Sequence, residues 1–211
     1  MTNRQLAFQK ASGQIIENLK KRNMEGYFFE DSASCVKAIL EMIPEGSSVS
    51  WGGSASFAES GMQDALFQGN YELIDRSTAS TPREQRELYA RTVMADYYFM
   101  SVNAMTYDGE LLNIDGNGNR AACLIHGPEH VFLIVGMNKL TSTLEGAFQR
   151  ARAMACPPNA VRLHKQTPCG LTGKCGDCLA PDCFCNQIVV TRRSGHAGRI
   201  KVFLVAEDLG F

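Results

Sequence analysis

The chain has 211 residues, of which 45% are hydrophobic and 20% are charged, so it is long enough to bury a core and has an ordinary globular composition. Its 21 Lys and Arg residues balance 22 Asp and Glu residues to a net charge of -1, which excludes a basic field that attracts nucleic acid or an anionic membrane. We therefore expect one domain over residues 1–211 that binds neither.

The N-terminal segment, residues 1–25, predicts a helix rather than a targeting sequence. Its apolar residues fall near helical spacing over residues 4 to 23. It lacks the apolar region of a signal peptide, and no apolar run in the chain approaches the roughly 20 residues that span a bilayer. We expect a cytoplasmic protein, in which clustered cysteines more often bind metal or act in catalysis than form disulfides.

Between residues 26 and 155, short apolar runs alternate with helical patterns. This alternation is typical of βαβ units and predicts an α/β fold whose mainly parallel sheet is covered by helices. The expected strands are GYFF (26–29), SVSW (48–51), YELID (71–75), DYYFMSV (96–102) and HVFLIVG (130–136), and the expected helices cover about 32–43, 56–68, 82–94, a segment from 117, and 142–154. Three pairs have the spacing of a capping box: Ser56 with Glu59, Thr81 with Glu84, and Ser142 with Glu145.

The alternation ends after Ala155. A cysteine-rich segment covers residues 156–186, and two β-like runs follow, QIVVTRR (187–193) and RIKVFLVAE (199–207). The turn residues SGHAG separate these runs. We therefore expect a terminal β-hairpin over residues 187–211 that adds antiparallel strands to the edge of the sheet.

Gly-rich turns follow several of the expected strands. Gly52-Gly53-Ser54 follows SVSW and opens a helix, so its backbone N–H groups are suited to an anion, although a purely structural turn has the same pattern. The segment NAMTYDGELLNIDGNGNR, residues 103–120, contains an Asp-Gly hairpin signal, a short strand over 110–114 and a second Gly-rich helix start. Lys139 follows HVFLIVG and offers a positive charge near the same edge of the sheet.

The residues from 101 to 140, SVNAMTYDGELLNIDGNGNRAACLIHGPEHVFLIVGMNKL, closely resemble the LUD domain family of lactate utilisation. The likeness continues through TLEGAFQRAR and PPNAVRL into the cysteine-rich segment. The resemblance implies a fold like that of ribose-5-phosphate isomerase and CoA-transferases. It also implies an association with lactate oxidation to pyruvate, beside iron–sulfur partner subunits.

The same segment is distantly similar to sugar-phosphate isomerases related to the regulatory subunits of translation factor 2B. Those proteins have an Asp five positions before an Asn-Gly turn and an Asn shortly after it, and Asn103 and Asn113 occupy these positions here. Asn103 lacks the carboxylate that transfers a proton, so the isomerase route is not supported. Asp108, Glu110 or Asp115 replaces that carboxylate only if it faces the cleft.

Five of the eight cysteines lie between Cys169 and Cys185. Cys175 and Cys178 form a CxxC pair that lets two thiolates meet one centre, and Cys169 and Cys185 complete a four-thiolate set. Since the set has one short pair and two longer arms, we favour a [4Fe–4S] cluster over zinc. Free or oxidised thiols and a structural disulfide remain alternatives.

The family resemblance implies the same four ligands. Cysteines of the related segment correspond to Cys169, Cys175, Cys178 and Cys185, so that Cys156 and Cys183 are extras in this chain.

We predict a small anionic metabolite or cofactor in a cleft formed by residues 52–56, 103–120 and 138–139. The expected ligand-binding residues are Gly52, Gly53, Ser54, Asn113, Gly116, Gly118, Asn119, Arg120, Asn138 and Lys139, and the residues expected to act on the ligand are Asn103, Asp108 and Asp115. Two alternatives stay open: a non-catalytic iron–sulfur electron-transfer or assembly subunit, and a metabolite-sensing regulatory module. Self-association of the chain is a further expectation.

Overall fold

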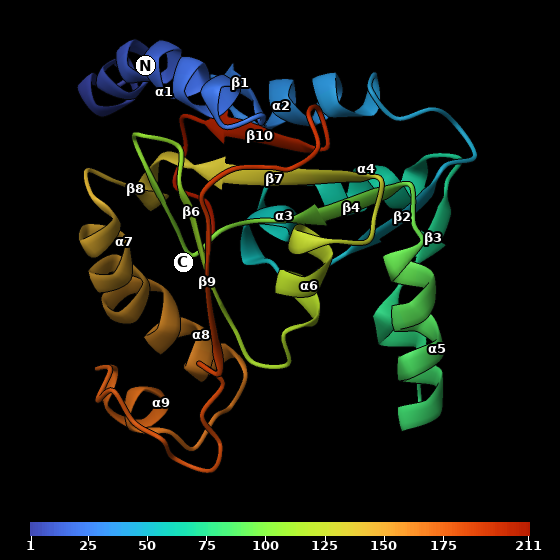
Figure 1. Ribbon diagram of the computed structural model, residues 1–211, viewed down its shortest axis with the longest axis vertical. Coiled ribbons are helices and arrows are strands. Elements are labelled where there is room, and N and C mark those ends of the chain that lie inside the picture. The colour runs from blue at the N-terminus through green and yellow to red at the C-terminus, as the bar shows by residue number, and fades with distance from the viewer.

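Six strands form the central sheet of the protein in the computed structural model, which describes residues 1–211 (Figure 1). Every neighbouring pair in this sheet is parallel. In spatial order the strands are β1 (Glu25–Phe29), β10 (Ile200–Val205), β7 (His130–Gly136), β4 (Tyr97–Met100), β2 (Ser48–Trp51) and β3 (Glu72–Ile74). The expected α/β fold with a mainly parallel sheet is confirmed.

Both faces of the central sheet are buried, which explains why its middle strands are apolar along their whole length. In β4, Tyr98 and Met100 pack into the core on one face, while Tyr97 and Phe99 pack into the core on the other. Three helices contribute to the first core: α1 (Asn3–Lys21), α5 (Pro82–Val93) and α6 (Asn119–Ile125). Three contribute to the second: α2 (Ser32–Leu40), α3 (Ala55–Glu59) and α4 (Met62–Gln68).

A second sheet of four strands lies beside the first, in the order β8-β5-β6-β9. Its strands are β5 (Ala104–Thr106), β6 (Leu111–Asp115), β8 (Leu140–Thr141) and β9 (Gln187–Thr191). The predicted Asp-Gly turn joins β5 to β6, and Gly109 adopts a φ of +89° there. A third core packs this sheet against α7 (Leu144–Arg150), the π-helical turn Ala151–Ala155 and α8 (Cys156–Arg162).

The predicted terminal hairpin is wrong. The two runs belong to different sheets: β9 pairs antiparallel with β6, and β10 lies parallel between β1 and β7. Strand β10 is apolar because it is buried on both sides, with Val202, Phe203 and Leu204 fully inaccessible. Turn residues between two strands are compatible with a hairpin but do not require one, and here they carry the chain from one sheet to the other.

One of the three predicted capping boxes is present. Thr81 begins α5 with both hydrogen bonds of the motif. The other two predicted capping boxes are wrong, because the N-cap residue of α3 is Ser54 and that of α7 is Thr143. Ser56 is instead buried, and its hydroxyl donates to the carbonyl of Leu209.

Several predicted helices are shorter than expected. Gly61, with a φ of +79°, separates α3 from α4 within the expected helix over 56–68. Helix α1 ends at Lys21, so the N-terminal segment already includes the start of β1 at Glu25. The cysteine-rich segment begins as helix α8 and contains one more short helix, α9 (Pro168–Thr172).

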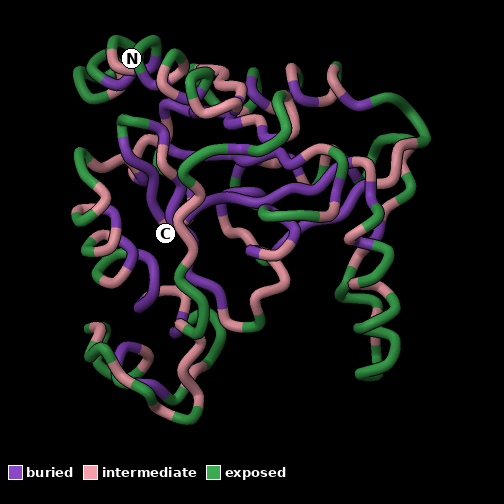
Figure 2. Tube along the Cα trace, viewed as in Figure 1, coloured by how far each residue is buried: buried purple, intermediate pink, exposed green.

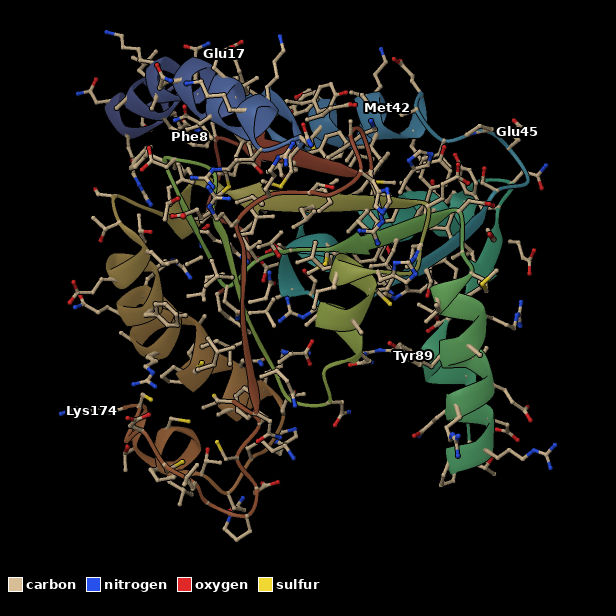
Figure 3. All side chains as sticks on the ribbon, in the orientation of Figure 1. Phe8, Glu17, Met42, Glu45, Tyr89 and Lys174 are labelled. Carbon is tan, nitrogen blue, oxygen red and sulfur yellow. The ribbon has the colours of Figure 1, made fainter.

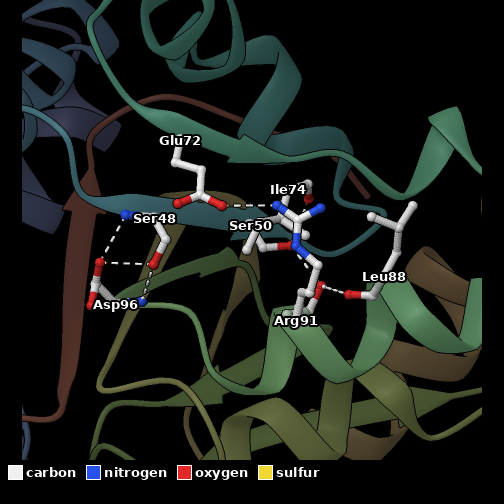
Figure 4. Close-up of polar contacts among 8 residues, drawn as sticks. Ser48, Ser50, Glu72, Ile74, Leu88, Arg91 and Asp96 are labelled. Atoms are coloured by element: carbon white, nitrogen blue, oxygen red, sulfur yellow. Dashed lines mark hydrogen bonds and ion pairs between the residues drawn. The ribbon is translucent and has the colours of Figure 1, made fainter.

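Burial is concentrated in the two sheets, whereas the outer side of α5 and the cysteine-rich segment are more exposed (Figure 2). Polar contacts tie β2 to the start of β4 and to β3 (Figure 4). The Asp96 carboxylate accepts from the backbone N–H and the hydroxyl of Ser48, both at 2.7 Å. The Ser50 hydroxyl donates to the carbonyl of Ile74 across the β2–β3 pair.

None of the helices has the length and apolarity needed to cross a membrane.

Candidate functional site

The carboxyl ends of β2 and β4 define the candidate site. The two strands are neighbours in the sheet. After β2 the chain continues to α3, which packs on one face of the sheet. After β4 it continues to the second sheet and then to α6, which packs on the other face. In open α/β sheets, ligands bind where neighbouring connections diverge in this way. Residues 52–55 line the crevice from the β2 side, and residues 101–103 line it from the β4 side.

A cavity of about 50 Å³ lies at the floor of this crevice. Four of the residues predicted from the sequence line it, namely Ser54, Asn103, Arg120 and Lys139. These residues come from three separate connections between strands of the central sheet, and the fold brings them together.

Lys139 is the most unusual side chain in the cavity. It follows β7 in the short 3₁₀-helix η2 (Met137–Lys139) and is buried, with only 4% of its surface exposed. Its ammonium donates to Ser56 Oγ at 2.7 Å, to Ser101 Oγ at 3.2 Å and to the carbonyl of Val102 at 3.1 Å. All three donors of a charged lysine are therefore used.

The two serine hydroxyls are oriented as acceptors for Lys139. Ser56 donates its proton to the carbonyl of Leu209 at 3.0 Å, and Ser101 donates to the carbonyl of Ile134 at 2.6 Å. Each hydroxyl therefore presents a lone pair to the lysine nitrogen. This arrangement favours the charged form, because a neutral amine has one donor fewer.

Burial acts in the opposite direction. Together with the positive charges of Arg150 and Arg120, and against the negative charge of Glu59, burial lowers the pKa of Lys139 to about 7. The ammonium thus titrates near neutral pH. An anion that enters the cavity is expected to favour the charged form and raise the pKa again.

Arg120 is buried in the same region, and burial lowers its pKa. Its Nη1 donates to the carbonyl of Ser101 at 3.0 Å and to Asn113 Oδ1 at 2.7 Å. Its Nη2 donates to Asn103 Oδ1 at 3.2 Å and to the carbonyl of Ile114 at 2.8 Å. Because its terminal donors are all used within the protein, Arg120 organises the site and contributes charge rather than free hydrogen bonds.

Asp115 is held in place by backbone donors. Its carboxylate accepts from the N–H of Gly118 at 3.1 Å and from the N–H of Ala121 at 2.9 Å, and it lies 3.7 Å from Arg120 Nε. Asp115 is the buried last residue of β6, four residues before α6 begins at Asn119. These contacts give it a structural role at the helix start and partly balance the arginine.

The two predicted asparagines share the arginine as a partner. The side-chain oxygen of Asn103 also accepts from the N–H of Ile114 at 2.8 Å. Asn113 is fully buried, and its side-chain nitrogen has no hydrogen-bond partner in the protein. A buried donor without an acceptor is costly, which marks the interior of this site as polar and incompletely satisfied.

Asp108, Gly116 and Asn138 are among the predicted residues that do not line the cavity. Asp108 lies at the β5–β6 turn, where its carbonyl accepts from Arg22 Nε at 2.7 Å. Gly116 packs against Phe184. The side chain of Asn138 bonds to the backbone of residues 209 and 210 rather than facing the crevice.

A wider groove of about 420 Å³ continues from the cavity along the predicted Gly-rich turn. Ser54 lines both spaces and begins α3 by accepting from the N–H of Phe57. A side chain at Gly52 would bring its Cβ within 2.9 Å of the Tyr98 hydroxyl and 3.0 Å of Arg120 Cδ. Gly52 therefore lets the turn approach both neighbours closely.

The sequence reasoning missed three polar residues around the crevice, Arg76, Ser101 and Arg150, and it included Ser56 in the predicted cleft without giving it a role. Arg76 lines the groove, and Ser101 and Ser56 bind Lys139. Arg150 donates to the carbonyl of Asn103 at 2.6 Å and so fixes the loop after β4. Arg76 directly follows the expected strand over 71–75, so the same search of strand ends could have found it. Ser101 lies inside the expected strand over 96–102, which in the structure ends at Met100. Arg150 carries no such signal.

Two further predicted residues lie at the start of α6. Gly118 adopts a φ of +78° immediately before the helix, a conformation that favours glycine. Asn119 lines a separate cavity of about 310 Å³ beside the crevice.

The predicted cluster ligands do not form a ready four-thiolate site. All eight cysteines are free thiols, and nowhere in the structure do three His, Cys, Asp or Glu side chains converge in a metal-binding arrangement. Cys169 is buried in α9, where its sulfur lies 3.2 Å from Thr167 Oγ1. The [4Fe–4S] cluster at Cys169, Cys175, Cys178 and Cys185 remains a prediction.

Cysteines outside the predicted set lie close to members of it. Cys185 Sγ lies 3.7 Å from Cys156 Sγ, and this hydrogen bond together with burial raises the pKa of Cys185 well above its usual range. The pKa of Cys183 is also raised. The backbone N–H of Cys185 favours its thiolate, but burial and the neighbouring thiols of Cys185 and Cys178 outweigh that effect. Two of these four cysteines, Cys156 and Cys183, were expected to be extras.

The fold and the crevice define an α/β protein with a candidate ligand site at the carboxyl edge of a parallel sheet. The sequence model of the LUD domain matches residues 13–205, and the chain belongs to the LUD domain family, which is associated with lactate utilisation. A search of curated proteins finds no match.

Two solved structures are similar to this chain. A DUF162 family protein from Deinococcus radiodurans has a TM-score of 0.55 and 11% identity, and the match covers 97% of this chain and 99% of that one. The delta subunit of eIF2B from Chaetomium thermophilum has a TM-score of 0.37 and 14% identity, with coverage of 57% and 54%. The first likeness shows that the fold extends over nearly the whole chain.

Proposed function

We propose that this chain binds a small anionic metabolite, with a carboxylate or phosphate group, in the crevice between the ends of β2 and β4, and that it serves lactate utilisation through this site. The observation that carries the proposal is the concentration of buried positive charge there. Arg120 and Lys139 line one cavity, and no carboxylate lies within 4.0 Å of Lys139. Buried charge without a full complement of opposite charge attracts an anion.

The proposed roles follow from the contacts. Lys139 supplies a positive charge that an anion stabilises, since burial and the nearby arginines lower the pKa of that lysine to about 7. Arg120 holds the walls of the cavity in place and adds to the positive potential. Ser54 and the glycines before it contribute the rim of the site, where the backbone approaches a ligand closely.

Thermal unfolding with lactate, pyruvate and inorganic phosphate tests this proposal. A ligand at 100 times its Kd adds about 2.7 kcal/mol to the free energy of unfolding, which gives a clear rise in Tm. We expect that rise with the unchanged protein and its loss in Lys139→Met, a variant that keeps the apolar bulk of the side chain. Asp108→Asn removes a charge at the distant β5–β6 turn and is expected to keep the response. An equal response in Lys139→Met would overturn the proposed site.

A second assay separates a catalytic role from a subunit role. Lactate oxidation by the isolated chain would favour an enzyme. Activity that appears only when iron–sulfur partner proteins are added would favour a non-catalytic subunit. Absence of both, with anion binding intact, would favour a metabolite-sensing module.

A further inference from the structure

A second cavity of about 310 Å³ adjoins the crevice and has a different character. Aromatic side chains and polar groups line it together. The residues that matter here are Trp51, Tyr89, Tyr98, Arg76, Asn117 and Asn119. Figure 3 shows Tyr89 on the side of α5 that faces α6.

The aromatic walls are held rigidly by the core. Trp51 is 8% exposed and stacks on Phe57, with the ring centroids 5.8 Å apart. Phe67 contacts the Trp51 ring edge-on at the same centroid distance. Tyr98 is almost completely buried in the core, and the partly buried Tyr89 packs against the same core. Rings fixed in this way offer a prepared surface to a planar ligand, since little side-chain freedom is lost on binding.

Polar side chains lie at the margin of the same cavity. Asn117 and Asn119 each carry an amide with both donors and acceptors, as the edge of a heteroaromatic ring requires. Arg76 is exposed, and none of the ion pairs within the protein involves it. Its guanidinium therefore remains available for an anionic group.

Arg76 lies where the aromatic cavity meets the Gly-rich groove. Trp51, Arg76 and Ser77 line both spaces. A Cβ added at Gly53 would lie 2.5 Å from Arg76 Nη2, so the guanidinium rests directly against the glycine turn. The groove in turn shares Ser54 with the Lys139 cavity. A ligand thus has a continuous path from the aromatic walls, past Arg76, to the buried lysine.

We propose that the ligand of this crevice is an extended anion with a phosphorylated planar heteroaromatic ring, of the nucleotide class. The ring lies between Trp51, Tyr89 and Tyr98, and the phosphate lies against Arg76 and the Gly52-Gly53 turn. The volume of the aromatic cavity is close to the lower bound of about 300 Å³ for small-molecule sites, and the adjoining groove provides the remaining space. This inference rests on the proposed function for the end of the ligand that approaches Lys139.

Isothermal titration calorimetry with four probes tests the inference. Adenosine diphosphate and flavin mononucleotide carry both a ring and phosphate, adenosine carries only the ring, and pyrophosphate carries only the charge. We expect one of the first two to bind at least tenfold more tightly than adenosine and pyrophosphate. Whichever of them binds more tightly identifies the ring as a purine or a flavin.

Two variants and a control locate the contacts. Arg76→Ala is expected to weaken binding of the tighter ring-phosphate probe about tenfold and to leave adenosine binding unchanged. Tyr89→Leu is expected to weaken adenosine binding by about tenfold, since stacking on an aromatic ring contributes a factor of this order. Arg91→Ala removes a charge from the same helix, where Arg91 pairs with Glu72 at 2.8 Å, and is expected to bind as the unchanged protein does.

The two proposals fail separately. If neither ring-phosphate probe binds, or if pyrophosphate binds equally well, the inference about the aromatic cavity is wrong. In that case a Tm response to lactate, pyruvate or phosphate that Lys139→Met abolishes would still support the proposed function. The opposite result is an absent Tm response to lactate, pyruvate and phosphate, with a ring-phosphate probe that binds and whose binding Arg76→Ala weakens. In that case the aromatic cavity is part of the ligand site and the Lys139 cavity is not.

Discussion

Replacing Arg120 with alanine is expected to cost the fold about 3–5 kcal/mol, the usual range when one partner of a buried charged network is removed. The guanidinium donates hydrogen bonds to Ser101, Asn113, Asn103 and Ile114 at 2.7–3.2 Å. Bonds to a charged group contribute about 1.5–3 kcal/mol each, and the cost of burying the charge offsets much of the total. A domain with a stability of about 5–15 kcal/mol is expected to remain folded but with a small margin.

Urea unfolding followed by the fluorescence of Trp51 measures this loss. Trp51 is the only tryptophan and is largely buried, so unfolding changes its environment. The matched control is Arg76→Ala, because Arg76 is an exposed arginine in the same part of the molecule, and its stability is expected to change by less than about 0.5 kcal/mol. A loss below about 1 kcal/mol in Arg120→Ala, or an equal loss in the control, would refute the structural role assigned to Arg120.

Arg120→Lys gives an independent check. A lysine has three donors on one nitrogen and cannot reproduce the planar fork that serves two backbone carbonyls and two asparagine oxygens. We expect it to recover less than half of the stability that the alanine variant loses. Full recovery would mean that charge, rather than the directed hydrogen bonds, stabilises the site.

Three further predictions concern Lys139, the cysteines and a buried glycine. Burial and the nearby arginines lower the pKa of Lys139 from 10.5 to about 7, so the unfolded chain binds more protons between these pH values. The free energy of unfolding should therefore rise from pH 7 towards pH 10 in a pH series of urea unfolding, and Lys139→Met should remove that part of the rise. After anaerobic purification, metal analysis and an absorption spectrum are expected to show loss of bound iron in Cys169→Ser and its retention in Cys183→Ser. The reverse result would mean that Cys183 is an iron ligand and Cys169 is not. A Cβ at Gly136 would lie 2.6 Å from a backbone nitrogen, so Gly136→Ala is expected to lose about 1–3 kcal/mol in thermal unfolding, whereas Gly13→Ala, which has open space around it, should lose nothing.

The sequence by itself determined the local elements and where polar residues follow them. The runs at 26–29, 48–51, 71–75, 96–102 and 130–136 all contain strands of the central sheet. The middle strands β4 and β7 are buried on both faces, which requires a continuous apolar run. The Asp108-Gly109 turn also follows from local chemistry. Since parallel strands bring their carboxyl ends to one edge, the residues after them could be expected to share a crevice.

The tertiary structure alone decided which strands pair and which donors stay free. Strand β10 entered the middle of the central sheet rather than forming a hairpin with β9, because strand partners are set by packing between distant segments. Arg120 and Lys139 both lie at the site, yet their donors are used by Ser101 and its neighbours. The thiol neighbours of Cys185 likewise depend on how α8 packs. Spacing along a chain shows which groups can meet, but only the packed fold determines which groups do.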